Sequence, residues 1–300
     1  MKGAGERPNQ SNFGGSGLDR RRFLAVGATL LAAGRSSRAT AAETLRFGLT
    51  PVFLTSDLEL LESLKAYLMA QLDRPVELVQ RRTYQEITAL LLSEQLTAAW
   101  ICGFPYVQYR DHLELVAVPV WRGKPLYQSY LIVPRGREAQ DFADLRGDIH
   151  AFSDPDSNSG YLVTRALLAE RRETPSSYFG KFFFTYGHRN VVRAVASGLA
   201  ESGSVDGYVW EVMRDLEPDL TAATRILRHS EWLGFPPIAC ARSLRDTAMV
   251  RRLSRALHHM SADETGRRVL EMLRLDAFAP ADPQIFNGIA AKYDLVKSMG

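Results

Sequence analysis

The order of hydrophobic patterns along this chain constrains its fold more than any other feature. Short apolar segments typical of strands alternate with longer segments in which apolar residues recur every three or four positions, as in amphipathic helices. The first such helix is predicted over 57–72, with leucines at 58, 61, 64, 68 and 72. Because parallel strands need helical crossovers, the pattern predicts an α/β fold with mostly parallel strands.

The remaining elements follow from the same periodicities. Strands are predicted at residues 45–49, 76–79, 98–101, 113–120, 127–133, 148–152, 182–184, 206–209 and 224–227. Further helices are predicted at 84–92, from Tyr161 onward, at 190–198, and over most of 244–275 and 283–297. No internal repeat or low-complexity segment interrupts this order.

The N-terminal segment has the pattern of a twin-arginine export signal. Asp19-Arg20-Arg21-Arg22-Phe23-Leu24 precedes the uncharged stretch 25–34, and Ala39-Thr40-Ala41 supplies an A-x-A cleavage site. A disordered basic tail would explain the arginines but not the apolar run, and that run is shorter than the roughly 20 residues needed to span a bilayer. Arg35 stands where a lipoprotein would carry its acylated cysteine. We therefore expect residues 1–41 to be removed and the mature protein to be soluble in the periplasm, without a lipid anchor.

The net charge of the remaining chain excludes one class of partner. Without residues 1–41 the chain carries 30 lysines and arginines against 32 aspartates and glutamates, and it has no long basic stripe. Nucleic acid is therefore not an expected partner. With 46% hydrophobic residues the chain is long enough to bury a large core and to divide into two lobes.

The cysteine and histidine spacings predict no metal site and no cofactor. Cys102 and Cys240 are the only two cysteines, and no C-x-x-C or H-E-x-x-H motif occurs. His258 and His259 are adjacent on a predicted helix, where neighbouring side chains diverge. Export would permit a bridge between the two cysteines, and the sequence leaves that question open.

A polar turn in the middle of the chain predicts an anion site. Ser157-Asn158-Ser159-Gly160 lies between Asp154-Pro155-Asp156 and the helix that starts at Tyr161. The first N–H groups of a helix lack intrahelical acceptors, and the helix dipole is positive there. The plain alternative is a serine that only caps the helix.

Several motifs, taken in order, give the chain a family resemblance. They are Trp100-Ile101-Cys102-Gly103-Phe104-Pro105-Tyr106, Tyr127-Gln128-Ser129-Tyr130, Asp144-Leu145-Arg146-Gly147, the serine turn, Tyr178-Phe179-Gly180, Gly187-His188, Val205-Asp206-Gly207 and Phe235-Pro236-Pro237. From about Leu45 to about Leu244 the chain resembles the periplasmic substrate-binding proteins of phosphate, phosphite and phosphonate ABC transporters. The resemblance implies a type II periplasmic-binding-protein fold, in which two crossing strands join lobe 1 (43–130 and 231–300) to lobe 2 (131–230).

The resemblance also implies a set of ligand-binding residues. The anion cradle falls on Ser157, Asn158, Ser159 and His188, with His188 favoured in its charged form beside the anion. Asp206 would accept a hydrogen bond from a ligand that keeps a proton, which selects phosphorus oxyanions over sulfate. The implied pocket walls, for whose aromatic members core packing is an equal alternative, are Thr50, Tyr84, Cys102 and Tyr127.

The implied function is capture of a small tetrahedral oxyanion by a monomer that delivers it to a transporter permease. One alternative rests on Cys102, whose thiol could bind arsenite if a helix N-terminus lowered its pKa, in a sensor that partners a histidine kinase. A buried, inert thiol is the opposing interpretation. Ser157, His188 and Asp206 are the residue types of a catalytic triad, but without a G-x-S-x-G or P-loop motif we expect no enzyme.

Overall fold

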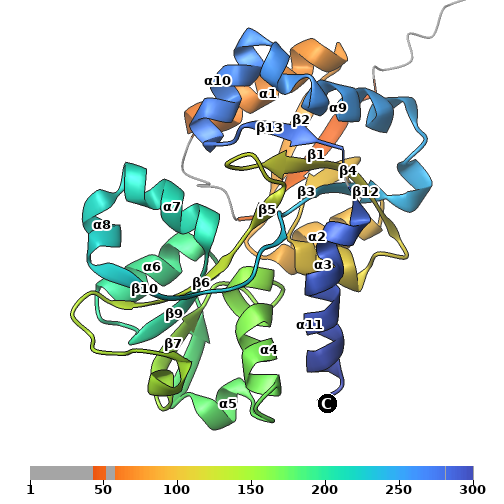
Figure 1. Cartoon of the computed structure of the whole chain (residues 1–300). Helices are drawn as coiled ribbons and strands as arrows, with labels where there is room; N and C mark the ends of the chain where they lie inside the picture. Colours follow the sequence, from red (N-terminus) through yellow and green to blue (C-terminus); the bar gives the residue numbers. More distant parts are fainter. Residues whose placement is uncertain (1–42, 52–57, 281, 300) are drawn as a thin grey trace, which may run out of the picture. The chain divides into compact units, whose positions relative to one another are not determined.

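Two large β-sheets organise the chain in this computed structural model (Figure 1). The structure describes residues 43–51, 58–280 and 282–299, so the predicted twin-arginine signal at 1–41 lies outside the described residues. The first sheet has six strands in the order β13-β4-β12-β3-β1-β2. Its strands are β1 (Leu45–Leu49), β2 (Val76–Gln80), β3 (Ala98–Trp100), β4 (Leu113–Val120), β12 (Ile238–Ala241) and β13 (Ala277–Ala279).

The second sheet has five strands in the order β10-β6-β9-β7-β8. Its strands are β6 (Ser129–Pro134), β7 (Ile149–Phe152), β8 (Lys181–Phe184), β9 (Ser202–Asp206) and β10 (Thr224–His229). Between the sheets, β5 (Leu126–Tyr127) pairs antiparallel with β11 (Leu233–Gly234). The chain therefore leaves the first sheet along β5 and returns to it along β11.

Helices flank both sheets (Figure 1). Those of the six-stranded sheet are α1 (Leu58–Leu72), α2 (Tyr84–Leu92), α3 (Gly103–Gln108), α9 (Ala248–His258) and α10 (Glu264–Leu273). Those of the five-stranded sheet are α4 (Val163–Ala169), α5 (Pro175–Tyr178), α6 (His188–Ala196), α7 (Gly207–Leu216) and α8 (Pro218–Ala222). The last helix, α11 (Asn287–Lys297), packs against both α3 and α4. None of the described helices has the length and apolarity to cross a membrane.

The sheets are mixed, so the expectation of mostly parallel strands is wrong. β1 runs parallel to β2 and β3, and β7 runs parallel to β8 and β9, as the helical crossovers between them require. β4, β6, β10 and β12 pair antiparallel with their neighbours. These are the strands next to the two passages between the sheets, where no crossover helix fixes a parallel direction.

A second difference concerns the residues around Asp206. The strand predicted at 206–209 lies earlier, at Ser202–Asp206, and α7 begins directly after it at Gly207. Asp206 is the N-cap of α7, and its carboxylate accepts the Val209 N–H at 3.2 Å. Gly207 lets the helix start close to a strand, because a Cβ there would lie 2.6 Å from the Gln128 carbonyl oxygen.

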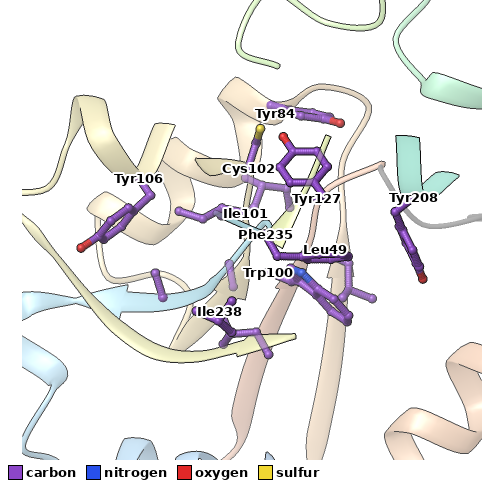
Figure 2. Close-up of a cluster of buried hydrophobic side chains, with 14 of the residues drawn as sticks. Leu49, Tyr84, Trp100, Ile101, Cys102, Tyr106, Tyr127, Tyr208, Phe235 and Ile238 are labelled. Atoms are coloured by element: carbon purple, nitrogen blue, oxygen red, sulfur yellow. The ribbon is translucent and has the colours of Figure 1, made fainter. Parts of the chain in front are cut away.

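At one end of the hydrophobic core of the six-stranded sheet, the buried side chains carry polar groups. Figure 2 shows Trp100, Leu49 and Ile238 at one end of a buried cluster and Tyr84, Cys102 and Tyr127 at the other. All of these side chains are at most 2% exposed. Tyrosine hydroxyls and a thiol at the edge of a packed core position a polar surface rigidly.

Candidate functional site

The serine turn forms a tight, buried loop at the end of β7. Asp154 organises it, because its carboxylate accepts the Asp156 N–H at 2.8 Å and its carbonyl accepts the Ser157 N–H at 3.0 Å. The Ser157 hydroxyl then accepts the Gly160 N–H at 3.0 Å. The chain continues as one π-helical turn, Asn158–Leu162, before α4. Both serines and Asn158 are at most 1% exposed, so the predicted turn is present and almost fully removed from solvent.

His188 and Asp206 lie beside the turn, one at the start of α6 and the other at the end of β9. His188 is the first residue of α6, and its Nε2 lies 3.5 Å from the Ser157 hydroxyl oxygen. Its Nδ1 accepts the backbone N–H of Asp206 at 3.0 Å. The Ser159 hydroxyl lies 3.5 Å from the Asp206 carboxylate. The four residues Ser157, Ser159, His188 and Asp206 are therefore brought together.

Burial opposes a charge on the His188 ring, whereas the charged form was expected only beside a bound anion. Burial lowers the pKa of His188 to about 3. Since Nδ1 is an acceptor, the proton of the neutral ring is on Nε2, which faces Ser157. His188 is thus a neutral hydrogen-bond donor toward the turn. It has no basic nitrogen left to deprotonate Ser157, and its Nδ1 partner is the Asp206 backbone instead of the carboxylate that a catalytic triad requires.

Asp206 has an unusually basic carboxylate. Burial raises the pKa of Asp206 to about 7, although hydrogen bonds from Val209, Tyr208 and Ser159 oppose the shift. The group therefore exchanges its proton near neutral pH. Such a carboxyl group can accept a hydrogen bond when ionised and donate one when protonated.

Three residues predicted for the pocket walls contact the turn or its flank, from α2, from the start of α3 and from β5. The Asn158 backbone N–H donates to the Cys102 sulfur at 3.1 Å, and its side-chain amide donates to the Tyr127 hydroxyl at 2.8 Å. The Tyr84 N–H, at the start of α2, donates to the Asp154 carboxylate at 3.3 Å. Figure 2 shows Tyr84, Cys102 and Tyr127 grouped together. Thr50 differs, because its hydroxyl donates to the Trp100 carbonyl within its own sheet and no described hydrogen bond joins it to the turn.

Three buried polar atoms around the turn have no hydrogen-bond partner among the described residues. They are the Tyr84 hydroxyl, the Ser153 hydroxyl and the side-chain oxygen of Asn158. Each unsatisfied buried polar group costs about 1–3 kcal/mol. Polar atoms gathered in this way can be satisfied by a bound polar ligand or by ordered water.

Four contributors to the site were not among the predicted residues. Gly160 stood in the predicted turn and Asp154 on its flank, but neither was given a role in binding. Ser153 precedes that motif, and a Cβ on Gly160 would lie 1.8 Å from the Ser153 hydroxyl oxygen. The Ser129 hydroxyl donates to the Ser159 carbonyl at 2.6 Å. The Tyr127-Gln128-Ser129-Tyr130 motif carried a signal for Ser129, whereas Ser153 gave none.

Both cysteines are buried thiols with raised pKa values. Cys102 and Cys240 are both free and buried, so no disulfide joins them. Burial raises the pKa of Cys102 to about 12, which is opposite to the lowered pKa that arsenite binding was expected to use. Within the described ranges no cluster of three or more histidine, cysteine or acidic side chains could hold a metal ion.

Comparison with known families decides which family the chain belongs to. Residues 47–286 match the family described as the periplasmic substrate-binding protein of phosphonate ABC transporters. The chain belongs to this phosphonate-binding family. The resemblance inferred from the motifs is confirmed. Nothing in the family match supports the sensor alternative.

Solved structures similar to this family member confirm its α/β fold. A binding protein of a phosphonate ABC transporter from Pseudomonas aeruginosa has 19% identity and a TM-score of 0.79, over 86% of this chain and 88% of that one. A Prochlorococcus marinus protein in complex with methylphosphonate has 17% identity and a TM-score of 0.75, over 85% and 98% of the two chains. A chloride-bound protein from Xanthomonas citri has 18% identity and a TM-score of 0.69, over 85% and 98%. At these identities the likeness establishes the type II periplasmic-binding-protein fold.

Proposed function

We propose that the serine turn binds the phosphorus end of a small oxyanion, namely a phosphonate, phosphite or phosphate. The observation that carries this proposal is the group of unpartnered buried polar atoms beside the turn, from Tyr84, Ser153 and Asn158. The Ser157 and Ser159 hydroxyls and the His188 Nε2–H add neutral donors on the other side. Tyr127 and Cys102, which accept hydrogen bonds from Asn158, would line the same binding site. Thr50 would contribute only by its hydrogen bond to the carbonyl of Trp100, two residues before Cys102 in the chain.

Asp206 gives the site its selectivity in this proposal. A phosphonate or hydrogen phosphate that keeps one proton can donate it to the ionised Asp206 carboxylate, whereas sulfate has no proton to donate. Sulfate would instead leave two negative charges unpaired in a buried site, which is costly. The Ser159 hydroxyl and the Asp206 carboxylate lie 3.5 Å apart. On binding, the ligand hydroxyl would donate to Asp206, and the Ser159 hydroxyl would turn to donate to an anionic oxygen of the ligand.

The two halves of the protein would close on the ligand. We propose lobe 1 as 43–130 with 231–300 and lobe 2 as 131–230, and the separate strand sets of the two sheets support this division. The β5–β11 pair would act as the hinge. The hydrogen bonds from Asn158 to Cys102 and Tyr127, and from Tyr84 to Asp154, join residues of the two proposed lobes.

The wider setting follows from the family and from the N-terminal sequence. The proposed partner is an ABC-transporter permease that receives the ligand from a monomeric binding protein. Export by the twin-arginine pathway, cleavage after residue 41 and release into the periplasm without a lipid anchor complete the proposal. No cofactor or metal enters it, and no catalytic step is needed.

Thermal unfolding in the presence of candidate ligands tests the proposed function. Methylphosphonate, phosphite, phosphate and 2-aminoethylphosphonate are compared with sulfate and arsenite. A ligand at 100 times its dissociation constant should add about 2.7 kcal/mol to the free energy of unfolding. We expect this stabilisation from phosphorus oxyanions, its loss in Ser159→Ala, and its retention in Ser261→Ala, which changes an exposed serine far along the chain. Equal stabilisation by sulfate, or none by any phosphorus oxyanion, would contradict the proposal.

Replacing Tyr84 with phenylalanine isolates one unpartnered atom. The Tyr84 hydroxyl has no described partner, so its removal should leave the ligand-free protein equally stable or up to about 1 kcal/mol more stable. Methylphosphonate affinity should fall about tenfold, as for one lost hydrogen bond. Calorimetric titration and urea unfolding measure the two effects.

Tyr67→Phe is the matched control, because the Tyr67 hydroxyl is also buried but donates to the Ala256 carbonyl at 2.6 Å. This variant should lose about 1 kcal/mol of stability and keep its ligand affinity. An unchanged affinity in Tyr84→Phe would remove Tyr84 from the binding site.

A further inference from the structure

A cavity lies beside chain segments that also carry residues of the proposed site. It has a volume of about 760 Å³. Its lining residues are close neighbours in sequence of three predicted site residues. Pro51 follows Thr50, Arg82 stands two residues before Tyr84, and Tyr186 stands two residues before His188. Three segments of the cavity wall therefore lie within two residues of the proposed site along the chain.

The cavity is lined by groups that attract negative charge. Arg81 and Arg82 are both exposed on its wall, and the Arg82 guanidinium makes no hydrogen bond or ion pair with any residue in the described part of the chain. The side-chain amide nitrogen of Gln80, which also lines the cavity, is buried and without a described partner. Three consecutive residues therefore place two guanidinium groups and one amide group at the wall of the same cavity.

One acidic group offsets part of this charge. Glu86 is the one carboxylate among the cavity's described lining residues, and hydrogen bonds from Thr83 lower its pKa and keep it ionised. Two arginines against one carboxylate still leave a net positive charge. The helices α2 and α6 both begin beside the cavity, and no side chain caps α6. Their N-terminal dipoles add to the positive potential of the two arginines.

We propose that this cavity binds a second anionic group of the ligand, so that the preferred substrate is a carboxyalkylphosphonate. This inference rests on the proposed function, since the phosphorus end would lie at the serine turn. The carboxylate would pair with Arg81 and Arg82, and the Gln80 amide would donate to it. A cationic tail, as in 2-aminoethylphosphonate, would meet two like charges and bind less tightly.

Calorimetric titration of the full chain with matched ligands tests the inference. The informative pair is 3-phosphonopropionate and propylphosphonate, which share a phosphonate and a three-carbon chain but differ in the terminal carboxylate. We expect the carboxylated ligand to bind about fivefold to tenfold more tightly, as two partly exposed charge pairs allow. 2-Aminoethylphosphonate should bind less tightly than propylphosphonate.

The double variant Arg81→Gln/Arg82→Gln should lose this preference and keep its methylphosphonate affinity. Arg251→Gln/Arg252→Gln on α9 removes the same charge from two exposed positions outside the cavity, and it should keep the preference. Equal affinity for the matched pair in the unmodified chain, or a preference that persists without Arg81 and Arg82, would overturn the inference alone. If methylphosphonate also fails to bind, the proposed function fails and the inference falls with it.

Discussion

Gly160→Ala is expected to abolish ligand binding and to destabilise the fold. A Cβ at this position would lie 1.8 Å from the Ser153 hydroxyl oxygen, 2.7 Å from the Ser153 Cβ and 3.0 Å from the His188 ring. The turn and α6 would have to move apart, and overpacking of this kind costs about 1–3 kcal/mol. The Gly160 N–H would then leave the Ser157 hydroxyl, so methylphosphonate affinity should fall at least about 100-fold.

Gly136→Ala is the control for this prediction. A Cβ added at Gly136 would meet no atom within 4 Å, and the φ of this residue is not positive, so the alanine should be tolerated. Urea unfolding and calorimetric titration compare the two variants. Wild-type affinity in Gly160→Ala would mean that the close approach of Ser153, Gly160 and His188 is not needed for binding.

Asp206→Asn is expected to make the ligand-free protein more stable and its binding weaker. Burial raises the pKa of Asp206 from 3.8 to about 7. Between these values the unfolded chain has released the proton and the folded chain still holds it, so the free energy of unfolding falls as pH rises from about 4 to about 7. At about 1.4 kcal/mol per pKa unit, the loss is at most about 4 kcal/mol. Above pH 7 the asparagine variant should therefore be the more stable protein.

Affinity should change in the opposite direction. An asparagine oxygen can still accept the Val209 N–H, but the group no longer offers a charged acceptor to a ligand hydroxyl. Methylphosphonate affinity should fall by about tenfold to 100-fold, and discrimination against sulfate should weaken. Asp215→Asn, an exposed position on the same helix, should change neither quantity. A pH dependence of stability that survives in Asp206→Asn would assign it to another group, of which Asp154 is the first candidate because burial raises its pKa to about 6.

The sequence predicted the elements whose periodicity is regular. The strands at 45–49 and 113–120, the helix at 84–92 and the turn after β7 all lie where the pattern placed them. The strand β9 was predicted too late in the chain, because Ser202, Gly203 and Ser204 carry no apolar alternation. Both serine hydroxyls hydrogen-bond the buried His150 ring at 2.8 Å. The strand β12 is buried along its whole length, so it lacks alternation as well.

At the site as well, features set by local sequence could be predicted and features set by tertiary contacts could not. Ser157 and its neighbours were predicted because a helix start after Asp-Pro is a local pattern. The protonation of His188 depends on the N–H of Asp206, 18 positions away, and on burial that no local pattern reveals. The contacts of Asn158 with Cys102 and Tyr127 depend on how two sheets meet, and therefore no spacing in the sequence announces them.

The absence of lysine and arginine from the serine-turn site determines how its ligand affinity depends on salt concentration. None of the nine residues predicted for the cradle and its walls carries a permanent positive charge, and the His188 ring is neutral. Dissolved ions weaken attraction between exposed charges over about 10 Å at 0.1 M, but they do not reach buried N–H and O–H dipoles. The serine turn should therefore hold its ligand equally well in dilute and in concentrated salt, and only the contribution of Arg81 and Arg82 should fade as ionic strength rises.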